Sequence, residues 1–137
     1  MIVVDANILA YFLLPGPRNE RAEALQRRDP EWATPFLCLS ELRNIVLGFL
    51  RRRQLSGAEA LEVVRRAEEI LSGREYTVSS ERVLALAAMS GCTAYDCEYA
   101  ALAEDLRVPL VTSDRQILRA FAKTAISLEE AVASLRR

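Results

Sequence analysis

Two short apolar runs in this chain each lead into an acidic residue. Residues 1–4 are followed directly by Asp5, and residues 108–111 are followed three positions later by Asp114. Short runs rich in β-branched residues are typical of strands buried in a parallel sheet. The carboxyl ends of parallel strands meet at one edge of the sheet, where ligands and chemistry collect. We therefore expect Asp5 and Asp114 to share a site.

The rest of the chain alternates brief apolar runs with stretches of helical spacing. Further strands are predicted at 33–35, 75–78 and 125–126. Helices are predicted at 7–14, 19–28, 40–53, 57–72, 81–90, 94–106 and 115–122, and from 128 onward. Two Ser-x-x-Glu capping boxes, at 56–59 and 127–130, support two of the helix starts. The alternation predicts an α/β fold with a mainly parallel sheet, and without a repeat or linker we expect residues 1–137 to form a single domain.

The composition narrows the possible chemistry. The chain has no histidine, which excludes Ser-His-Asp and Cys-His nucleophiles, nucleases that use histidine as acid or base, and the usual ligand sets of zinc hydrolases. Cys38, Cys92 and Cys97 form no C-x-x-C pair, so we expect reduced thiols in the core. With a net charge of −1, any polyanionic substrate would need a local basic patch.

The hydropathy pattern predicts no association with a membrane. The longest apolar run, near residues 8–14, is too short to span a bilayer. The chain starts on a strand-like run without the charged start and cleavage signal of a secretory leader. A cytoplasmic protein is therefore expected.

Two further acids lie at or near the starts of predicted helices. Glu41 has Leu42 and Ile45 as neighbours on its helix, so it should emerge beside an apolar stripe. Asp96 falls in a first helical turn, whereas Glu98, two positions later, should point elsewhere into solvent. Together with the strand-end acids, they suggest an acidic mouth at the carboxyl edge of the sheet. Each acid alone has a simpler interpretation as a turn residue, a helix cap or a partner of the helix dipole.

Electrostatic repulsion between the acids suggests that the acidic mouth binds a cation. Two carboxylates ~4 Å apart repel each other by ~4 kcal/mol at an effective dielectric constant near 20. Four in one pocket would not all stay ionised without a cation. Sets of oxygen ligands suit Mg²⁺ or Mn²⁺, and a pair of such ions can activate water for attack on a phosphodiester.

Four segments resemble, in order, the acidic motifs of PIN domains. They are Ile-Val-Val-Asp-Ala-Asn-Ile-Leu at 2–9, Leu-Ser-Glu-Leu at 39–42, Ala-Tyr-Asp-Cys-Glu-Tyr-Ala-Ala-Leu-Ala at 94–103 and Val-Thr-Ser-Asp at 111–114. Their order and spacing and the chain length are similar to those of a stand-alone VapC-like toxin, over essentially the whole chain. The resemblance implies a three-layer α/β/α sandwich around a five-stranded, mainly parallel sheet. It also implies a metal-dependent endoribonuclease, usually a homodimer, that acts as the toxin of a type II toxin–antitoxin pair and is held inactive by its antitoxin.

The resemblance also implies roles for individual residues. The four catalytic and metal-binding acids, which would hold Mg²⁺ or Mn²⁺, are Asp5, Glu41, Asp96 and Asp114. Asn7 and Thr112 match positions that support the site by hydrogen bonds. Tyr95 and Tyr99 match an aromatic pattern for which packing is the expected role.

Contacts with RNA are assigned from position alone. Arg115 directly follows Asp114 and is the preferred phosphate contact. The arginines at 51–53 end a predicted helix, where basic residues complement the helix dipole, although they too could hold an RNA backbone.

Three hypotheses for the function follow. The first is an Mg²⁺- or Mn²⁺-dependent ribonuclease whose products carry a 5′-phosphate and a 3′-hydroxyl. The alternative is a catalytically inactive PIN-fold module that binds a protein partner. A phospho-acceptor receiver domain is disfavoured, because Val4 rather than a second acid precedes Asp5 and the sole lysine, Lys123, follows a predicted helix.

Overall fold

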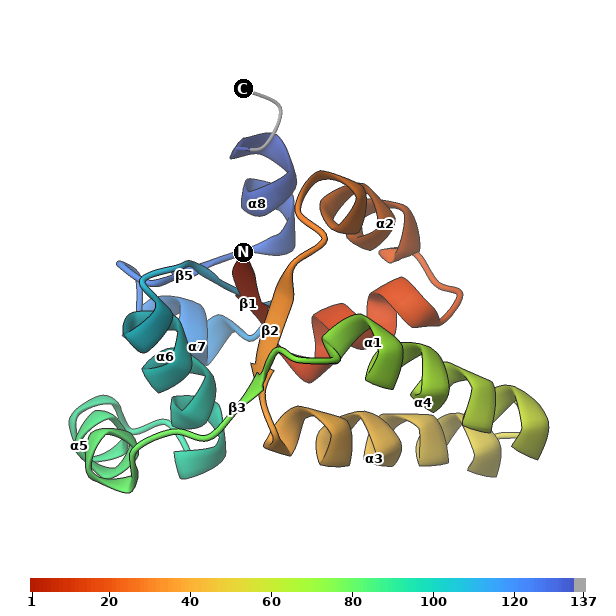
Figure 1. Cartoon of the computed structure of the whole chain (residues 1–137), viewed down its shortest axis with the longest axis horizontal. Coiled ribbons are helices and arrows are strands. Elements are labelled where there is room, and N and C mark those ends of the chain that lie inside the picture. The colour runs from red at the N-terminus through yellow and green to blue at the C-terminus, as the bar shows by residue number, and fades with distance from the viewer. Residues whose placement is uncertain (135–137) are drawn as a thin grey trace.

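A five-stranded sheet forms the centre of the fold (Figure 1). The structure is a computed structural model that describes residues 1–134. Within that range the strands are β1 (Ile2–Val4), β2 (Trp32–Pro35), β3 (Glu75–Tyr76), β4 (Leu110–Val111) and β5 (Ala125–Ile126). Their order is β3-β2-β1-β4-β5, and every pairing is parallel. The predicted α/β fold is therefore confirmed.

Helices cover both faces of the sheet. Across residues 1–134 they are α1 (Ala6–Leu13), α2 (Asn19–Arg28), α3 (Leu37–Arg51), α4 (Gly57–Leu71), α5 (Ser80–Ser90), α6 (Ala94–Leu106), α7 (Arg115–Ala120) and α8 (Leu128–Ser134). Helices α1, α3 and α4 pack together on one side, and α5 and α6 lie on the other, with α6 against β1, β2 and β4 (Figure 1). Helix α8 packs against α2. The three-layer sandwich implied by the resemblance is confirmed.

The apolar strands are buried at the middle of one hydrophobic core. Val3, Val4, Leu110 and Val111 are fully buried, as expected for central strands covered on both faces. Trp32, one residue before the strand predicted at 33–35, begins β2, is fully buried and packs edge-on against Phe12 with 5.4 Å between ring centroids. The three cysteines are buried and free, in agreement with the expectation of reduced thiols.

Most predicted element boundaries agree with the structure to within one residue, and two of the larger differences have local causes. Helix α3 begins at Leu37 rather than at residue 40; its N-cap, Phe36, makes no side-chain capping bond that the sequence could signal. Strand β4 begins at Leu110 rather than at 108. The amide of Val108 donates to the carbonyl of Ala103 at the end of α6, and Pro109 has no amide hydrogen to give to the sheet.

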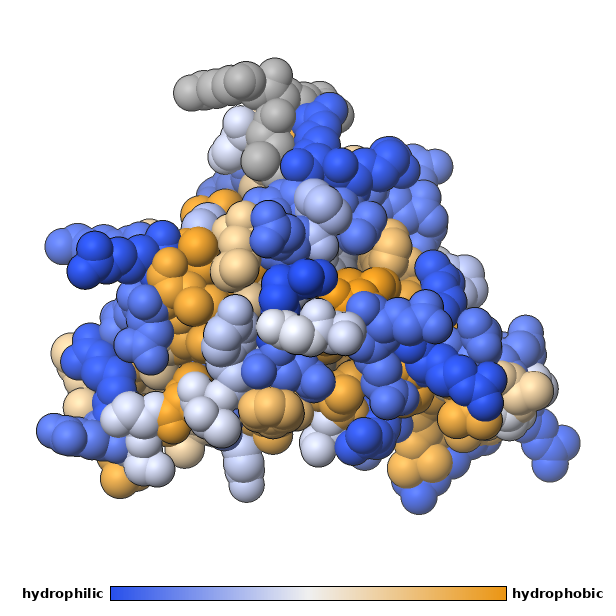
Figure 2. All heavy atoms as spheres, in the orientation of Figure 1, coloured by the Kyte–Doolittle hydropathy of each residue, from blue (hydrophilic) through white to orange (hydrophobic). Residues whose placement is uncertain are grey.

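The surface mixes polar and apolar residues. Figure 2 shows hydrophilic residues over most of one face, with hydrophobic residues in smaller groups between them, among the residues drawn in colour. None of the helices within residues 1–134 combines the length and the hydropathy that crossing a bilayer requires.

Candidate active site

The four predicted acids line one small cavity at the carboxyl edge of the sheet. Its volume is about 50 Å³, and its walls also include Ala6, Asn7, Tyr99 and Ile117. Strands β1 and β4 are neighbours, with Val4 opposite Val111, so Asp5 and Asp114 emerge from adjacent strands. Glu41 reaches the same cavity from α3 and Asp96 from α6. The sequence prediction of a shared acidic mouth matches this placement.

Asp5 is the most deeply buried of the four acids, at 6% exposure. One carboxylate oxygen, Oδ1, accepts a hydrogen bond of 3.0 Å from the amide of Ile8 and so caps α1. The other, Oδ2, accepts a short hydrogen bond from the hydroxyl of Thr112. Burial, with a smaller contribution from the charge of Glu41, raises the pKa of Asp5 from 3.8 to about 6 against these two lowering bonds. A cation beside Asp5 would offset the free-energy cost of ionising this buried carboxyl.

Thr112 connects the two strand-end acids. It is fully buried at the end of β4, and its Oγ1 also accepts a 3.1 Å hydrogen bond from the amide of Asp114. Its own amide donates to the carbonyl of Ile126 in β5, which fixes the backbone at this edge. One hydroxyl thus links Asp5 to the loop that carries Asp114.

Asp114 and Asp96 also take part in helix starts. Asp114 caps α7, because its Oδ1 accepts from the amides of Gln116 at 2.8 Å and Ile117 at 3.0 Å. Asp96 lies in the first turn of α6, where its amide donates to Thr93 Oγ1. Helix capping therefore explains the hydrogen bonds of one carboxylate oxygen of Asp114, and it explains why Asp96 lies in the first turn of α6. It does not account for the convergence of four acids on one cavity.

Glu41 is held by Tyr99, a residue for which packing was the expected role. The hydroxyl of Tyr99, three positions after Asp96 on α6, donates to Glu41 Oε1 at 2.5 Å. Tyr99 is buried and lines the acid cavity, whereas Tyr95 is 63% exposed, so a packing role is wrong for Tyr95. The spacing of three residues from Asp96 was the available signal for Tyr99, because residues three apart share a helix face.

Other predicted site residues lie at the rim. Asn7 is exposed and borders the cavity, and within residues 1–134 its side chain makes no hydrogen bond. Only its backbone amide acts on Asp5, where it lowers the pKa less than Thr112 and Ile8 do. Arg115 is exposed at the start of α7, next to Asp114. Glu98 lines a different cavity, beside Phe36 and Tyr76, as its position predicted. It is half-buried rather than solvated, and burial, followed by the charge of Glu41, raises its pKa.

The donor set fits a hard divalent cation in its chemistry. Four carboxylates without histidine are the oxygen ligands that Mg²⁺ and Mn²⁺ prefer. The arrangement is more open than a closed coordination shell: no group of three acidic or cysteine side chains between residues 1 and 134 is already gathered to hold one ion. Asp96 and Asp114 are only half-buried, so both remain accessible from solvent.

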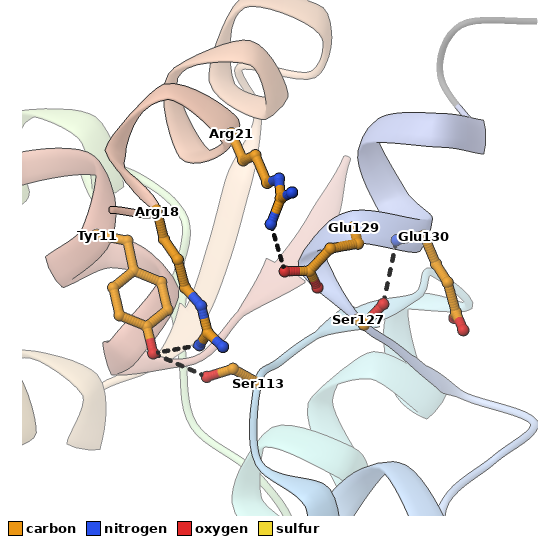
Figure 3. A network of polar contacts seen from close by, with 7 residues as sticks. All are labelled: Tyr11, Arg18, Arg21, Ser113, Ser127, Glu129 and Glu130. Atoms are coloured by element: carbon orange, nitrogen blue, oxygen red, sulfur yellow. Dashed lines mark hydrogen bonds and ion pairs between the residues drawn. The ribbon is translucent and has the colours of Figure 1, made fainter. Parts of the chain in front are cut away.

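A second polar network, which no local sequence pattern predicts, lies beside the acids. Arg18, just before α2, donates from Nη1 to the hydroxyl of Tyr11 at 2.9 Å, and that hydroxyl lies 3.1 Å from Ser113 Oγ (Figure 3). Ser113 sits between Thr112 and Asp114. The network therefore joins the α1–α2 connection to the loop that carries two of the site residues.

Comparison with known proteins places the chain among relatives of one kind. A family model described as PIN domain matches residues 2–126. A curated protein, Ribonuclease VapC3 of Pyrobaculum aerophilum, is 33% identical over 123 residues, which cover 88% of this chain and 94% of that protein.

Solved structures share the fold over nearly the whole chain. The crystal structure of PAE2754 from Pyrobaculum aerophilum has a TM-score of 0.77 and 25% identity, and the match covers 98% of this chain and 96% of that one. FitAcB from Neisseria gonorrhoeae has a TM-score of 0.70 at 22% identity, covering 94% and 99%. A toxin-antitoxin complex from Klebsiella pneumoniae has a TM-score of 0.66 at 23% identity, covering 93% and 98%.

Proposed function

Because this chain belongs to the PIN domain family, we propose that it is a metal-dependent endoribonuclease that hydrolyses phosphodiester bonds of RNA. The observation that carries the proposal is the convergence of Asp5, Glu41, Asp96 and Asp114, from four different elements, on one cavity. The name of the 33%-identical relative, a ribonuclease, supports the activity. We propose further that residues 1–137 act as one PIN-like domain.

The four carboxylates are the residues that would hold Mg²⁺ or Mn²⁺. When bound, such ions ionise water and neutralise the charge that develops on a phosphate. Thr112 and Tyr99 act on the carboxylates: each donates a hydrogen bond that fixes one oxygen, of Asp5 and of Glu41 respectively, and leaves the other lone pairs for a cation. The helix starts at Asp5 and Asp114 hold those side chains at the sheet edge. The expected products carry a 5′-phosphate and a 3′-hydroxyl.

Arg115 and Asn7 are proposed to act at the rim. Arg115 is exposed one residue from Asp114, where its guanidinium can donate two parallel hydrogen bonds to the oxygens of a phosphate. Asn7 borders the cavity with a free amide group that can form hydrogen bonds with the substrate.

The biological setting is proposed from the relatives. The chain would be the toxin of a type II toxin–antitoxin pair, cytoplasmic, homodimeric and held inactive by a cognate antitoxin protein. The name VapC and the printed description of the Klebsiella pneumoniae structure as a toxin-antitoxin complex motivate this assignment. An antitoxin-like reading frame directly upstream would support it.

The alternative is an inactive PIN-fold module that binds a protein partner. Such a module has no need to keep a buried carboxylate whose pKa is raised to about 6, next to three other acids. The free energy needed to keep this buried carboxylate ionised therefore favours the enzyme over the inactive module.

The experiment that tests the function is cleavage of total RNA by the purified chain. We expect cleavage with Mn²⁺ or Mg²⁺, none with EDTA, and recovery when Mn²⁺ is added back. Asp5→Asn and Asp96→Asn should both be inactive. The matched control is Asp105→Asn, which removes an exposed acid from the same helix as Asp96. Wild-type cleavage by both site variants would refute the proposal.

A further inference from the structure

Arg18 is a cation at the edge of the acidic site that no acid neutralises. Among residues 1–134 it forms no ion pair, as is true of most arginines in that range. What distinguishes it is its place beside the loop that carries Thr112 and Asp114. Its guanidinium instead lies 5.2 Å from the centroid of the Tyr11 ring and donates to the Tyr11 hydroxyl. Figure 3 shows the side chain reaching from the start of α2 across Tyr11 toward Ser113.

The surface between Arg18 and the acids is hollowed. Asn7 lines the acid cavity, and it also lines a cavity of about 360 Å³ with Ser40, Glu41 and Asn44. Asn7 lines a third cavity as well, of about 440 Å³, which contains Tyr11 and Arg18. Asn7 and Tyr11 are four residues apart on α1 and so share a helix face, about 6 Å apart along the axis. The adjoining cavities form a path from the acids to Arg18 along which an extended single strand of nucleic acid can lie.

Structural support of the α1–α2 connection does not explain Arg18. Asn19 already holds that connection, because its Nδ2 donates to the carbonyls of Tyr11 at 3.0 Å and Phe12 at 3.1 Å. Arg18 keeps four further N–H donors, and a neutral hydroxyl and a ring leave its charge uncompensated. Its orientation is nevertheless fixed, so the Arg18 side chain would lose little conformational entropy on binding a ligand.

RNA requires a positively charged group near these acids in order to bind. A phosphate backbone is repelled by a cluster of carboxylates, and the chain has no overall positive charge to offset the repulsion. We propose that Arg18, oriented by Tyr11, binds a backbone phosphate of the RNA that flanks the scissile phosphate. The proposal rests on the ribonuclease function above and adds a substrate contact 97 positions away in sequence from Arg115.

Steady-state cleavage of a labelled single-stranded RNA in Mn²⁺, over a series of salt concentrations, tests the proposal. Arg18→Gln should raise KM about tenfold, the scale of one charge-assisted contact, while kcat stays near wild type. The slope of log KM against log salt should fall by about 0.7, the value for one phosphate contact to a single strand. Arg18→Lys should restore most of the slope, and Tyr11→Phe should raise KM less than Arg18→Gln does.

Arg21→Gln is the matched control. Arg21 lies one turn further along α2, and its Nη1 pairs with Glu129 at 3.1 Å (Figure 3). The Arg21→Gln variant should keep the wild-type KM and the wild-type slope of log KM against log salt. Wild-type values for Arg18→Gln, or equal effects of Arg18→Gln and Arg21→Gln, would overturn the assignment while leaving the nuclease intact. If Arg18→Gln weakened only the binding of a protein partner, that would overturn it too. A wild-type chain that does not cleave RNA would overturn both proposals.

Discussion

The Tyr99 hydroxyl lies 2.5 Å from Glu41 Oε1 and donates a hydrogen bond to it across 58 positions of sequence. Burial, together with Cys38 and Glu41 beside it, raises the pKa of Tyr99, so the phenol stays protonated and remains a donor. Burial likewise raises the pKa of the neighbouring Cys38 thiol to about 12 and keeps it neutral. The negative charge behind the acid cavity is therefore confined to the carboxylates.

Replacement of this phenol tests whether it positions Glu41. Tyr99→Phe keeps the buried ring but removes the donor, so Glu41 should rotate more freely and Mn²⁺ affinity should fall about tenfold, at the low end for a residue that orients a metal ligand. Titration calorimetry with Mn²⁺ measures the change. Tyr95→Phe, at an exposed position on the same helix, is the control. Unchanged affinity in Tyr99→Phe would mean that the hydrogen bond does not position Glu41.

Thr112 should matter to stability through its hydroxyl rather than its shape. Thr112→Val leaves Asp5 Oδ2 without its donor and the amide of Asp114 without its acceptor. Unsatisfied buried groups cost about 1–3 kcal/mol, so urea unfolding in EDTA should show a loss of that size. Thr112→Ser keeps the hydroxyl and should lose clearly less. Equal losses in the two variants would indicate that the methyl group, not the hydrogen bonds, is responsible.

Asp5 should make the metal-free protein less stable as the pH rises. Its pKa is about 6 in the fold against 3.8 ordinarily, so the folded chain holds this proton more tightly than the unfolded chain does. The contribution of Asp5 to the free energy of unfolding is therefore highest below pH 3.8. It declines as the pH rises toward 6 and levels off above 6, lower by about 3 kcal/mol.

Asp5→Asn removes this dependence. In EDTA, the variant should gain stability relative to wild type between pH 4 and pH 6, by up to about 3 kcal/mol, and the gain should then stay constant. Urea unfolding at several pH values measures it, with Asp105→Asn as the control. A difference between variant and wild type that does not change with pH would contradict the account.

The sequence predicted the elements of the site better than their contacts. Asp5 and Asp114 were identifiable because each follows an apolar run that becomes a central strand, and parallel strands end at one edge. Which strands are neighbours is a tertiary property: β1 lies between β2 and β4, and nothing local in either run specifies that order.

The hydrogen bonds that orient the acids depend on the same long-range placement. Thr112 and Asp5 are 107 positions apart, and Tyr11 and Ser113 are 102 apart, so periodicity within one element carries no information about either pair. Arg18 follows a Pro-Gly-Pro turn, so the sequence alone suggests a loop residue. Its contact with Tyr11, which in turn contacts Ser113, is visible only in the folded structure.

The four carboxylates should form one site for a divalent cation, a claim that titration calorimetry with Mn²⁺ tests without any substrate. We predict saturable binding to the wild-type chain, at least tenfold weaker binding to Asp96→Asn, and wild-type affinity for Asp105→Asn on the same helix. Absence of saturable binding to the wild type, or equal affinities for the two variants, would contradict the claim.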